Sequence, residues 1–156
     1  MSAALRLDRA VREFVTVWIA DQLFGVEVRA VQDVFPLRAV TRVPKAPPEI
    51  AGVLNLRGRI VTAIDTRVRL GLPPRPEGLA GAMALGVEHN GEAYGLVIDR
   101  IGDVLKLPDS DFEANPVNLD PAWRAASEGV YRLEDRLLLV LDLKRMLDVG
   151  PAGAVK

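Results

Sequence analysis

The sequence predicts a mostly β protein made of two small linked barrels, and three observations support this fold class. The chain is internally duplicated, because residues 52–70 align with residues 129–147 through identical residues and matched apolar positions. Its strand-like segments are short, are separated by regular turn signals, and leave little room for helix. One repeat alone would expose an apolar face, so we expect the two units to pack on each other.

The repeat extends upstream with a slightly different offset, since residues 24–37 match residues 94–107. Each half therefore has the same plan of hairpin, connector, second hairpin and short helix. The segment 72–78 is rich in proline and glycine and is the natural boundary between the halves. We expect one domain over 1–148, with a first barrel subdomain over 13–72, a second over 80–148, and a C-terminal tail over 149–156.

The hairpins follow from alternating β-forming residues and from the turns between them. The first hairpin is expected to turn at Asp21-Gln22, and its counterpart turns at Asn90-Gly91, the pair that suits a type I′ turn. The second hairpin of the first half turns at Arg57-Gly58, where glycine tolerates a positive φ. Asp65 and Asp142 follow the last strand of each half and are expected to cap short helices.

Composition excludes several classes of function. The chain has 156 residues, a net charge of −1 and no cysteine, which excludes disulfides, thiolate metal sites and a cysteine nucleophile. The balanced charge gives no electrostatic footprint for nucleic acid or for an anionic membrane surface. No apolar stretch has the length of a signal peptide core or a membrane span, so we expect a cytoplasmic protein.

The residues that usually carry catalysis are missing or isolated. His89 is the only histidine and lies beside a turn, so neither a catalytic triad nor a transition-metal site can be assembled around it. Asp33 and Asp103 occupy equivalent places in the two repeats, and duplication explains this pairing without general acid–base chemistry. Neither phosphate-binding glycine motif occurs. By elimination, the function is expected to be binding, with no enzymatic activity, cofactor or metal.

Two kinds of residue remain open to more than one interpretation. Arg57 and Arg59 flank a tight turn and are either solvated residues of a hairpin tip or contacts for a partner, because arginine is enriched at interaction hot spots. Trp18 and Trp123 are expected in the core or at the seam between subdomains rather than in a ligand cage.

Residues 52–58 read Gly-Val-x-Asn-Leu-Arg-Gly, a specific string, and Phe24-Gly25-Val26 and Val31-Gln32-Asp33-Val34 precede it. With these motifs the sequence resembles, over residues 13–148, the bacterial chemotaxis coupling proteins of the CheW family. The resemblance implies two five-stranded SH3-like β-barrels around an apolar seam. It also implies a non-enzymatic adaptor that joins the cytoplasmic tips of methyl-accepting chemoreceptors to the regulatory domain of the histidine kinase CheA, at membrane receptor arrays, without inserting into the membrane itself.

The same resemblance carries over five residues as contacts for receptor or kinase, namely Val31, Asp33, Gly52, Arg57 and Gly129. Asp33 departs from the family, which usually has glutamate there. Gly52 and Gly129 lie at equivalent places where each half enters its second hairpin, so an added side chain would either strain the turn or block an approaching backbone. We expect Gly52→Trp to abolish receptor binding while leaving thermal unfolding nearly unchanged. Arg57 is expected to be free of folding constraints, because its counterpart in the other repeat is Glu134, whereas Arg59 recurs as Arg136.

Two alternative functions remain open from the sequence. The first is a β-barrel binding module in another chemosensory pathway, such as one that controls pili or development. The second is a small-molecule-binding or enzymatic barrel, which the absence of catalytic groups makes the weaker alternative.

Overall fold

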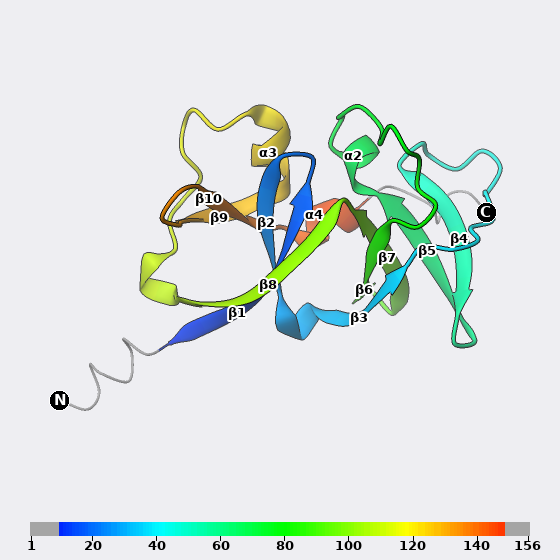
Figure 1. Cartoon of the computed structure of the whole chain (residues 1–156), viewed down its shortest axis with the longest axis horizontal. Coiled ribbons are helices and arrows are strands. Elements are labelled where there is room, and N and C mark those ends of the chain that lie inside the picture. The colour runs from blue at the N-terminus through cyan, green and yellow to red at the C-terminus, as the bar shows by residue number, and fades with distance from the viewer. Residues whose placement is uncertain (1–9, 149–156) are drawn as a thin grey trace.

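Ten β-strands form two five-stranded sheets in the computed structural model, which describes residues 10–148 (Figure 1). The mostly β class is therefore confirmed. The strands are β1 Val11–Ile19, β2 Gln22–Glu27, β3 Val31–Pro36, β4 Ile50–Leu56, β5 Arg59–Asp65, β6 Met83–His89, β7 Glu92–Ile98, β8 Arg100–Pro108, β9 Ser127–Arg132 and β10 Leu137–Leu141. The short helices are α2 Thr66–Arg69, α3 Pro121–Ala126 and α4 Leu143–Leu147, with single 3₁₀ turns η1 Val28–Ala30 and η2 Asp109–Asp111.

The two sheets have the same strand order once each strand is replaced by its repeat counterpart. Sheet A has the order β8-β1-β2-β10-β9, and sheet B has the order β3-β6-β7-β5-β4. Each sheet contains one parallel pair, β2 with β10 in sheet A and β5 with β7 in sheet B, and the other pairs are antiparallel. The duplication in the sequence is thus a duplication of the sheet topology.

Each sheet takes strands from both halves of the chain, which differs from the barrels expected over 13–72 and 80–148. The hairpin β1–β2 joins β8, β9 and β10, while the hairpin β6–β7 joins β3, β4 and β5. A hairpin satisfies only its inner backbone groups locally, and its outer edges can pair with the strands of either repeat. Sequence pattern alone does not decide between these partners. The expected tail over 149–156 lies outside the described residues.

The turns and helix caps agree with the local signals. Asn90 and Gly91 have φ values of 53° and 80°, as a type I′ turn requires. The first hairpin turns one residue earlier than expected, with Ala20 at φ 55°. The Asp65 side chain accepts hydrogen bonds from two backbone N–H groups of α2, and the Asp142 side chain accepts one from α4, so both expected caps are present.

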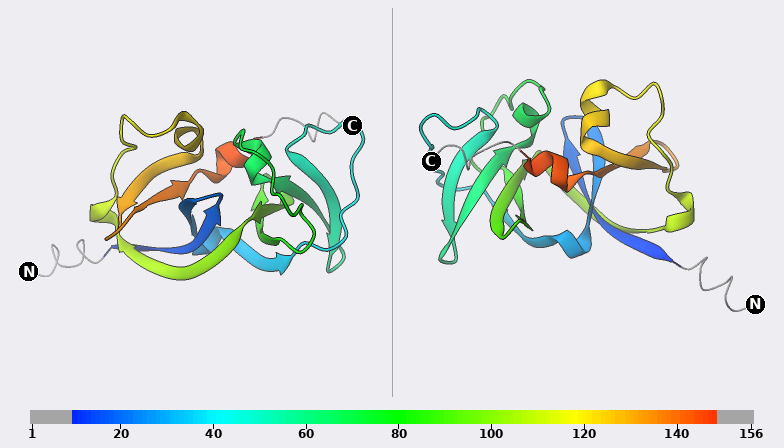
Figure 2. Two further views of the ribbon diagram at one scale, coloured as in Figure 1. Left: turned by 45° about the horizontal axis from the view of Figure 1, so that its top comes forward. Right: turned by 180° about the vertical axis from the view of Figure 1, so that it is seen from behind.

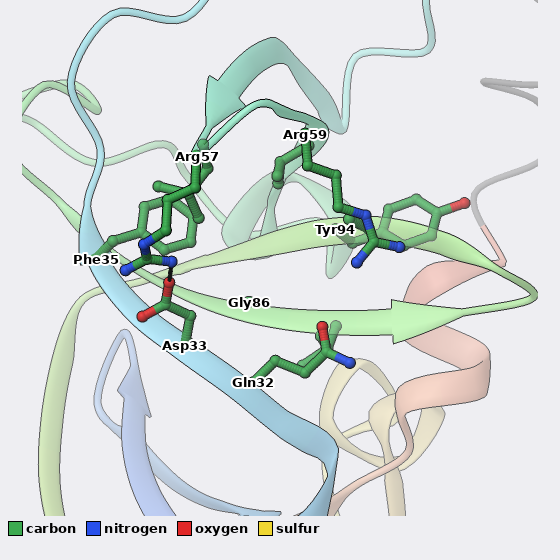
Figure 3. A pocket seen from close by; sticks show the side chains of 11 residues that line it. Gln32, Asp33, Phe35, Arg57, Arg59, Gly86 and Tyr94 are labelled. Atoms are coloured by element: carbon green, nitrogen blue, oxygen red, sulfur yellow. Dashed lines mark hydrogen bonds and ion pairs between the residues drawn. The ribbon is translucent and has the colours of Figure 1, made fainter.

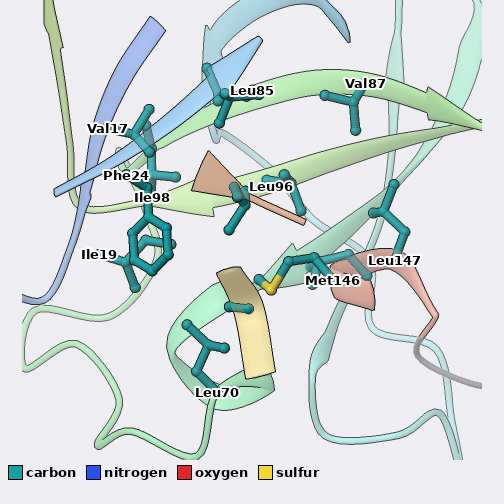
Figure 4. Packing of buried hydrophobic residues seen from close by; sticks show 14 of the residues in the cluster. Val17, Ile19, Phe24, Leu70, Leu85, Val87, Leu96, Ile98, Met146 and Leu147 are labelled. Carbon is teal, nitrogen blue, oxygen red and sulfur yellow. The ribbon is translucent and has the colours of Figure 1, made fainter. Parts of the chain in front are cut away.

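The largest apolar cluster lies between the sheets and takes side chains from both of them (Figure 4). Along β10, Leu139 faces this central core, whereas Leu138 faces a smaller cluster that belongs to sheet A. Helix α4 lies between the two sheets and contributes Met146 to the central core (Figure 2). Trp123 packs against the central core, in agreement with its expected place at the seam. Burial of this seam fixes how the sheets sit on each other.

Candidate functional site

A hollow of about 200 Å³ opens at one end of sheet B, beside the turn that joins β4 and β5 (Figure 3). Its apolar lining includes Phe35 of β3 and Tyr94 of β7, and its polar rim includes Asp33, Arg57 and Arg59. Asp33 and Phe35 are two residues apart on one strand and therefore share a face. The hollow thus brings together two of the five predicted contact residues, which are 24 positions apart in the chain.

Asp33 and Arg57 form an ion pair across the mouth of the hollow (Figure 3). The Asp33 carboxylate accepts a hydrogen bond from Nη1 of Arg57, and its other oxygen accepts one from the backbone N–H of Val34 at 2.9 Å. The bond from Arg57 lowers the pKa of Asp33 below its ordinary value. The Arg57 side chain is 71% exposed, so its guanidinium is held in place while most of it still faces solvent.

The expectation that the fold makes no demand on Arg57 is corrected in two respects. Arg57 has a partner within its own chain, namely Asp33. It also adopts φ 52°, next to Gly58 at φ 82°, so both central residues of this turn have positive φ and not the glycine alone. Arginine is held here despite a backbone conformation that it does not favour.

A second ion pair completes the rim. Arg59 Nη2 donates to Glu88 at 2.7 Å, and Gln32 Nε2 donates to the other oxygen of the same carboxylate at 2.9 Å. The hydrogen bond from Arg59 is the main cause that lowers the pKa of Glu88. Sequence reasoning did not single out Gln32, Glu88 or Tyr94. The expected β6–β7 hairpin could have indicated Glu88. Successive side chains of a strand point to opposite faces, so Glu88, which follows the buried Val87, lies on the opposite face of the strand.

Gly52 and Gly129 are buried and serve the fold. A Cβ built on Gly52 would lie 2.4 Å from the backbone oxygen of Thr41, and one on Gly129 would lie 2.6 Å from that of Glu113. Each glycine lies beneath a segment that pairs with the next residue of the glycine's own strand, Thr41 with Val53 on β4 and Glu113 with Val130 on β9. The expectation that Gly52→Trp would leave folding unchanged is therefore wrong, because there is no space for the added side chain.

Val31 begins β3 on the strand that carries Asp33. It is half-buried and packs against the central core. The structure thus places Val31, Asp33 and Arg57 close to one end of sheet B, and it places the two glycines inside the fold.

Two arrangements considered for chemistry, an aspartate pair and a metal-binding cluster, are not present among residues 10–148. Asp33 lies on β3 in sheet B and Asp103 on β8 in sheet A, so the two aspartates do not form a pair. Within residues 10–148 there is no group of three or more His, Cys, Asp or Glu side chains placed to hold a metal ion. None of the helices in this part of the chain combines the length and apolar character needed to cross a membrane. Paired arginines and carboxylates around an apolar floor suit recognition of another molecule.

A family model described as the CheW-like domain matches residues 13–150. The chain belongs to the CheW family. It is 28% identical over 142 residues to "Chemotaxis protein CheW" of Rhizobium meliloti, with 91% of each chain covered. It is 30% identical over 125 residues to the protein of that name from Bacillus subtilis, with 80% of each chain covered. Among solved structures, the scaffolding protein TtCheW of Thermoanaerobacter tengcongensis matches with a TM-score of 0.78 at 26% identity, covering 90% of this chain and 95% of that one.

Proposed function

We propose that this CheW-family protein is a non-enzymatic adaptor that couples the cytoplasmic tips of methyl-accepting chemoreceptors to a CheA-type histidine kinase. The family match over nearly the whole chain supports this role, as do the chemotaxis relatives and the scaffolding protein of the same fold. In this proposal each five-stranded sheet closes as an SH3-like barrel. The protein acts in the cytoplasm and is recruited to receptor arrays through its partners.

The observation that carries the proposal is the exposed ion pair of Asp33 and Arg57 at the mouth of an apolar hollow. An arginine that is already held by a carboxylate loses little side-chain entropy when a partner binds it. Its remaining N–H donors form a planar fork that suits carboxylates and carbonyl oxygens. We therefore assign the contact with the receptor tip or the kinase regulatory domain to this end of sheet B, with Val31, Asp33 and Arg57 as its residues.

The test is calorimetric titration of the purified protein with a CheA regulatory domain and, separately, with a receptor tip fragment. Arg57→Ala is expected to weaken binding to at least one partner about thirtyfold, which corresponds to about 2 kcal/mol for a hot spot. Arg145→Ala removes another exposed arginine that is ion-paired to an aspartate, far along the chain on α4, and is the matched control. If Arg57→Ala binds both partners as tightly as the parent does, the assignment of this site fails.

Two further measurements examine the rest of the proposal. Arg59→Ala is expected to weaken binding less than Arg57→Ala, because the Arg59 side chain is less exposed to a partner, at 49% against 71%. Equal losses would assign binding to the whole rim of the hollow.

The purified protein alone is expected to show neither ATP hydrolysis nor phosphotransfer, and to alter kinase output only when kinase and receptor are both present. Activity of the isolated chain would contradict the adaptor role.

A further inference from the structure

A second cluster of arginine and aromatic side chains lies on sheet A, away from the hollow. Trp18 is near the end of β1, and Arg100 stands directly opposite it at the start of β8. The guanidinium carbons of Arg100 and Arg136 lie 4.7 and 4.9 Å from the centre of one Trp18 ring. Trp18 is half-buried and packs against the apolar cluster of sheet A rather than the central core. Its expected place in the core or at the seam is thus only partly realised.

The two arginines have few acidic partners. Among residues 10–148, Arg100 forms no ion pair, and Arg136 forms one only with its chain neighbour Asp135, at 3.4 Å. Arg12 is an instructive contrast, since it also stacks on aromatic rings but is tied to Glu27 at 3.3 Å. A guanidinium that stacks on a ring uses its face, while the N–H donors at its edge stay available for hydrogen bonds. Arg100 and Arg136 therefore present such donors in a fixed position.

Comparison of the repeats shows what is missing beside Arg136. Arg136 is the counterpart of Arg59, which pairs with Glu88 in sheet B. The offset that matches Phe24 to Tyr94 also matches Trp18 to Glu88. The sheet registers agree with this match, because Trp18 pairs with Leu23 across its hairpin as Glu88 pairs with Ala93. Sheet A thus has an arginine, Arg136, at the position of Arg59, but it has Trp18 in place of the carboxylate of Glu88.

We propose that Trp18, Arg100 and Arg136 form a docking site for an acidic segment of a partner protein. A carboxylate of that segment accepts hydrogen bonds from the N–H donors at the edge of the Arg136 guanidinium, whose face lies against the indole. The indole provides a flat apolar surface for the neighbouring part of the segment and holds both guanidinium groups in place. This site is distinct from the hollow of sheet B, and it does not depend on the function proposed for that hollow.

The test uses hexaglutamate as the probe, titrated by calorimetry against the full chain at low salt. Arg136→Gln and Arg100→Gln are each expected to weaken binding about tenfold, because each removes a charge-assisted hydrogen bond from the site. Arg145→Gln is the matched control, since that exposed arginine already has an internal acid, Asp142, and it should bind the peptide as the parent does. If the two test variants and the control variant all bind the peptide with the same affinity, the attraction is non-specific and the proposal is overturned.

Trp18→Glu is the more decisive variant, because it gives Arg136 an internal carboxylate like that of Arg59. Peptide binding is expected to fall below detection while the circular dichroism spectrum stays that of the parent. If this variant fails to fold, Arg136→Gln alone decides the outcome. Phosphatidylglycerol vesicles and a DNA oligonucleotide are tested beside the peptide. Tighter binding to either of them, with the same dependence on Arg136, would replace an acidic protein segment with that partner and refute the proposal.

Discussion

Replacing Gly52 with alanine should destabilise the protein, because the new Cβ would collide with the backbone at Thr41. The Cβ would lie 2.4 Å from the Thr41 oxygen, whereas real Cβ contacts essentially never fall below 3.0 Å, so the bridging segment must move by at least 3.0 − 2.4 = 0.6 Å. That movement weakens the two 2.8 Å hydrogen bonds between Thr41 and Val53. Gly52 also has φ 148°, which a residue with a side chain rarely adopts. The two weakened hydrogen bonds and the backbone strain together lower the free energy of unfolding by about 3–4 kcal/mol.

The assay is thermal and urea unfolding followed by circular dichroism. For a chain of this length the expected loss lowers the melting temperature by roughly 6–16 °C. Gly58→Ala is the matched control, because its backbone also has a positive φ, of 82°, but nothing lies within 4 Å of the added Cβ. The control should lose only about 1 kcal/mol from backbone strain. If both variants unfold at the same temperature, close contact at Thr41 is not what requires glycine at position 52.

Three more predictions concern single polar groups. Arg57→Ala should raise the pKa of Asp33 towards its ordinary value, as followed by NMR of the carboxyl carbon, since the hydrogen bond from Arg57 is what lowers it. Because the folded pKa is depressed, this ion pair is present near neutral pH and is lost as the pH falls through that pKa. Tyr131→Phe should leave stability unchanged or raise it by up to about 1 kcal/mol, because the Tyr131 hydroxyl is buried and, although Arg12 lies near it, makes no hydrogen bond of ordinary geometry among the described residues. Asp99→Asn should cost about 2–4 kcal/mol in urea unfolding, because it weakens the ion pairs of Asp99 with Arg67 and Arg75 at 2.9 and 3.1 Å, in a site where all three side chains are largely buried.

Each of these predictions has an outcome that contradicts it. An Asp33 pKa that does not move in Arg57→Ala would mean that the pair is not formed in solution. A loss of more than 1 kcal/mol in Tyr131→Phe would mean that the hydroxyl has a partner, such as an ordered water. Asp103→Asn, at an exposed aspartate with no ion pair among the described residues, is the control for Asp99. Equal losses at both positions would remove any special role for the Asp99 ion pairs.

The parts of the fold that depend on neighbours in the chain could be predicted from the sequence. The type I′ turn at Asn90-Gly91 needs only two residues with positive φ, and the caps at Asp65 and Asp142 need only the next few backbone N–H groups. The duplication likewise predicted two equivalent units, because matched apolar positions repeat along the chain.

The parts that depend on distant pairing could not be predicted in this way. The partner of Arg57 is Asp33, on another strand of sheet B, and no local pattern indicates that the two meet. The close approach of Thr41 to Gly52 likewise depends on a loop that crosses back over β4. The resemblance to CheW-family proteins pointed to Asp33, Arg57 and the glycines together. Only the three-dimensional structure separates the exposed pair from the buried glycines.

The sharing of hairpins between the two repeats means that neither half of the chain contains the strands of a complete sheet. If each repeat were a separate molecule, the same pairing would require two copies to exchange their first hairpins, as in a domain-swapped dimer. Joining them in one chain makes that encounter intramolecular and independent of protein concentration. It also removes the requirement that both copies be identical. One end of the assembly can therefore keep the Arg59–Glu88 pair while the other end replaces the acid with Trp18.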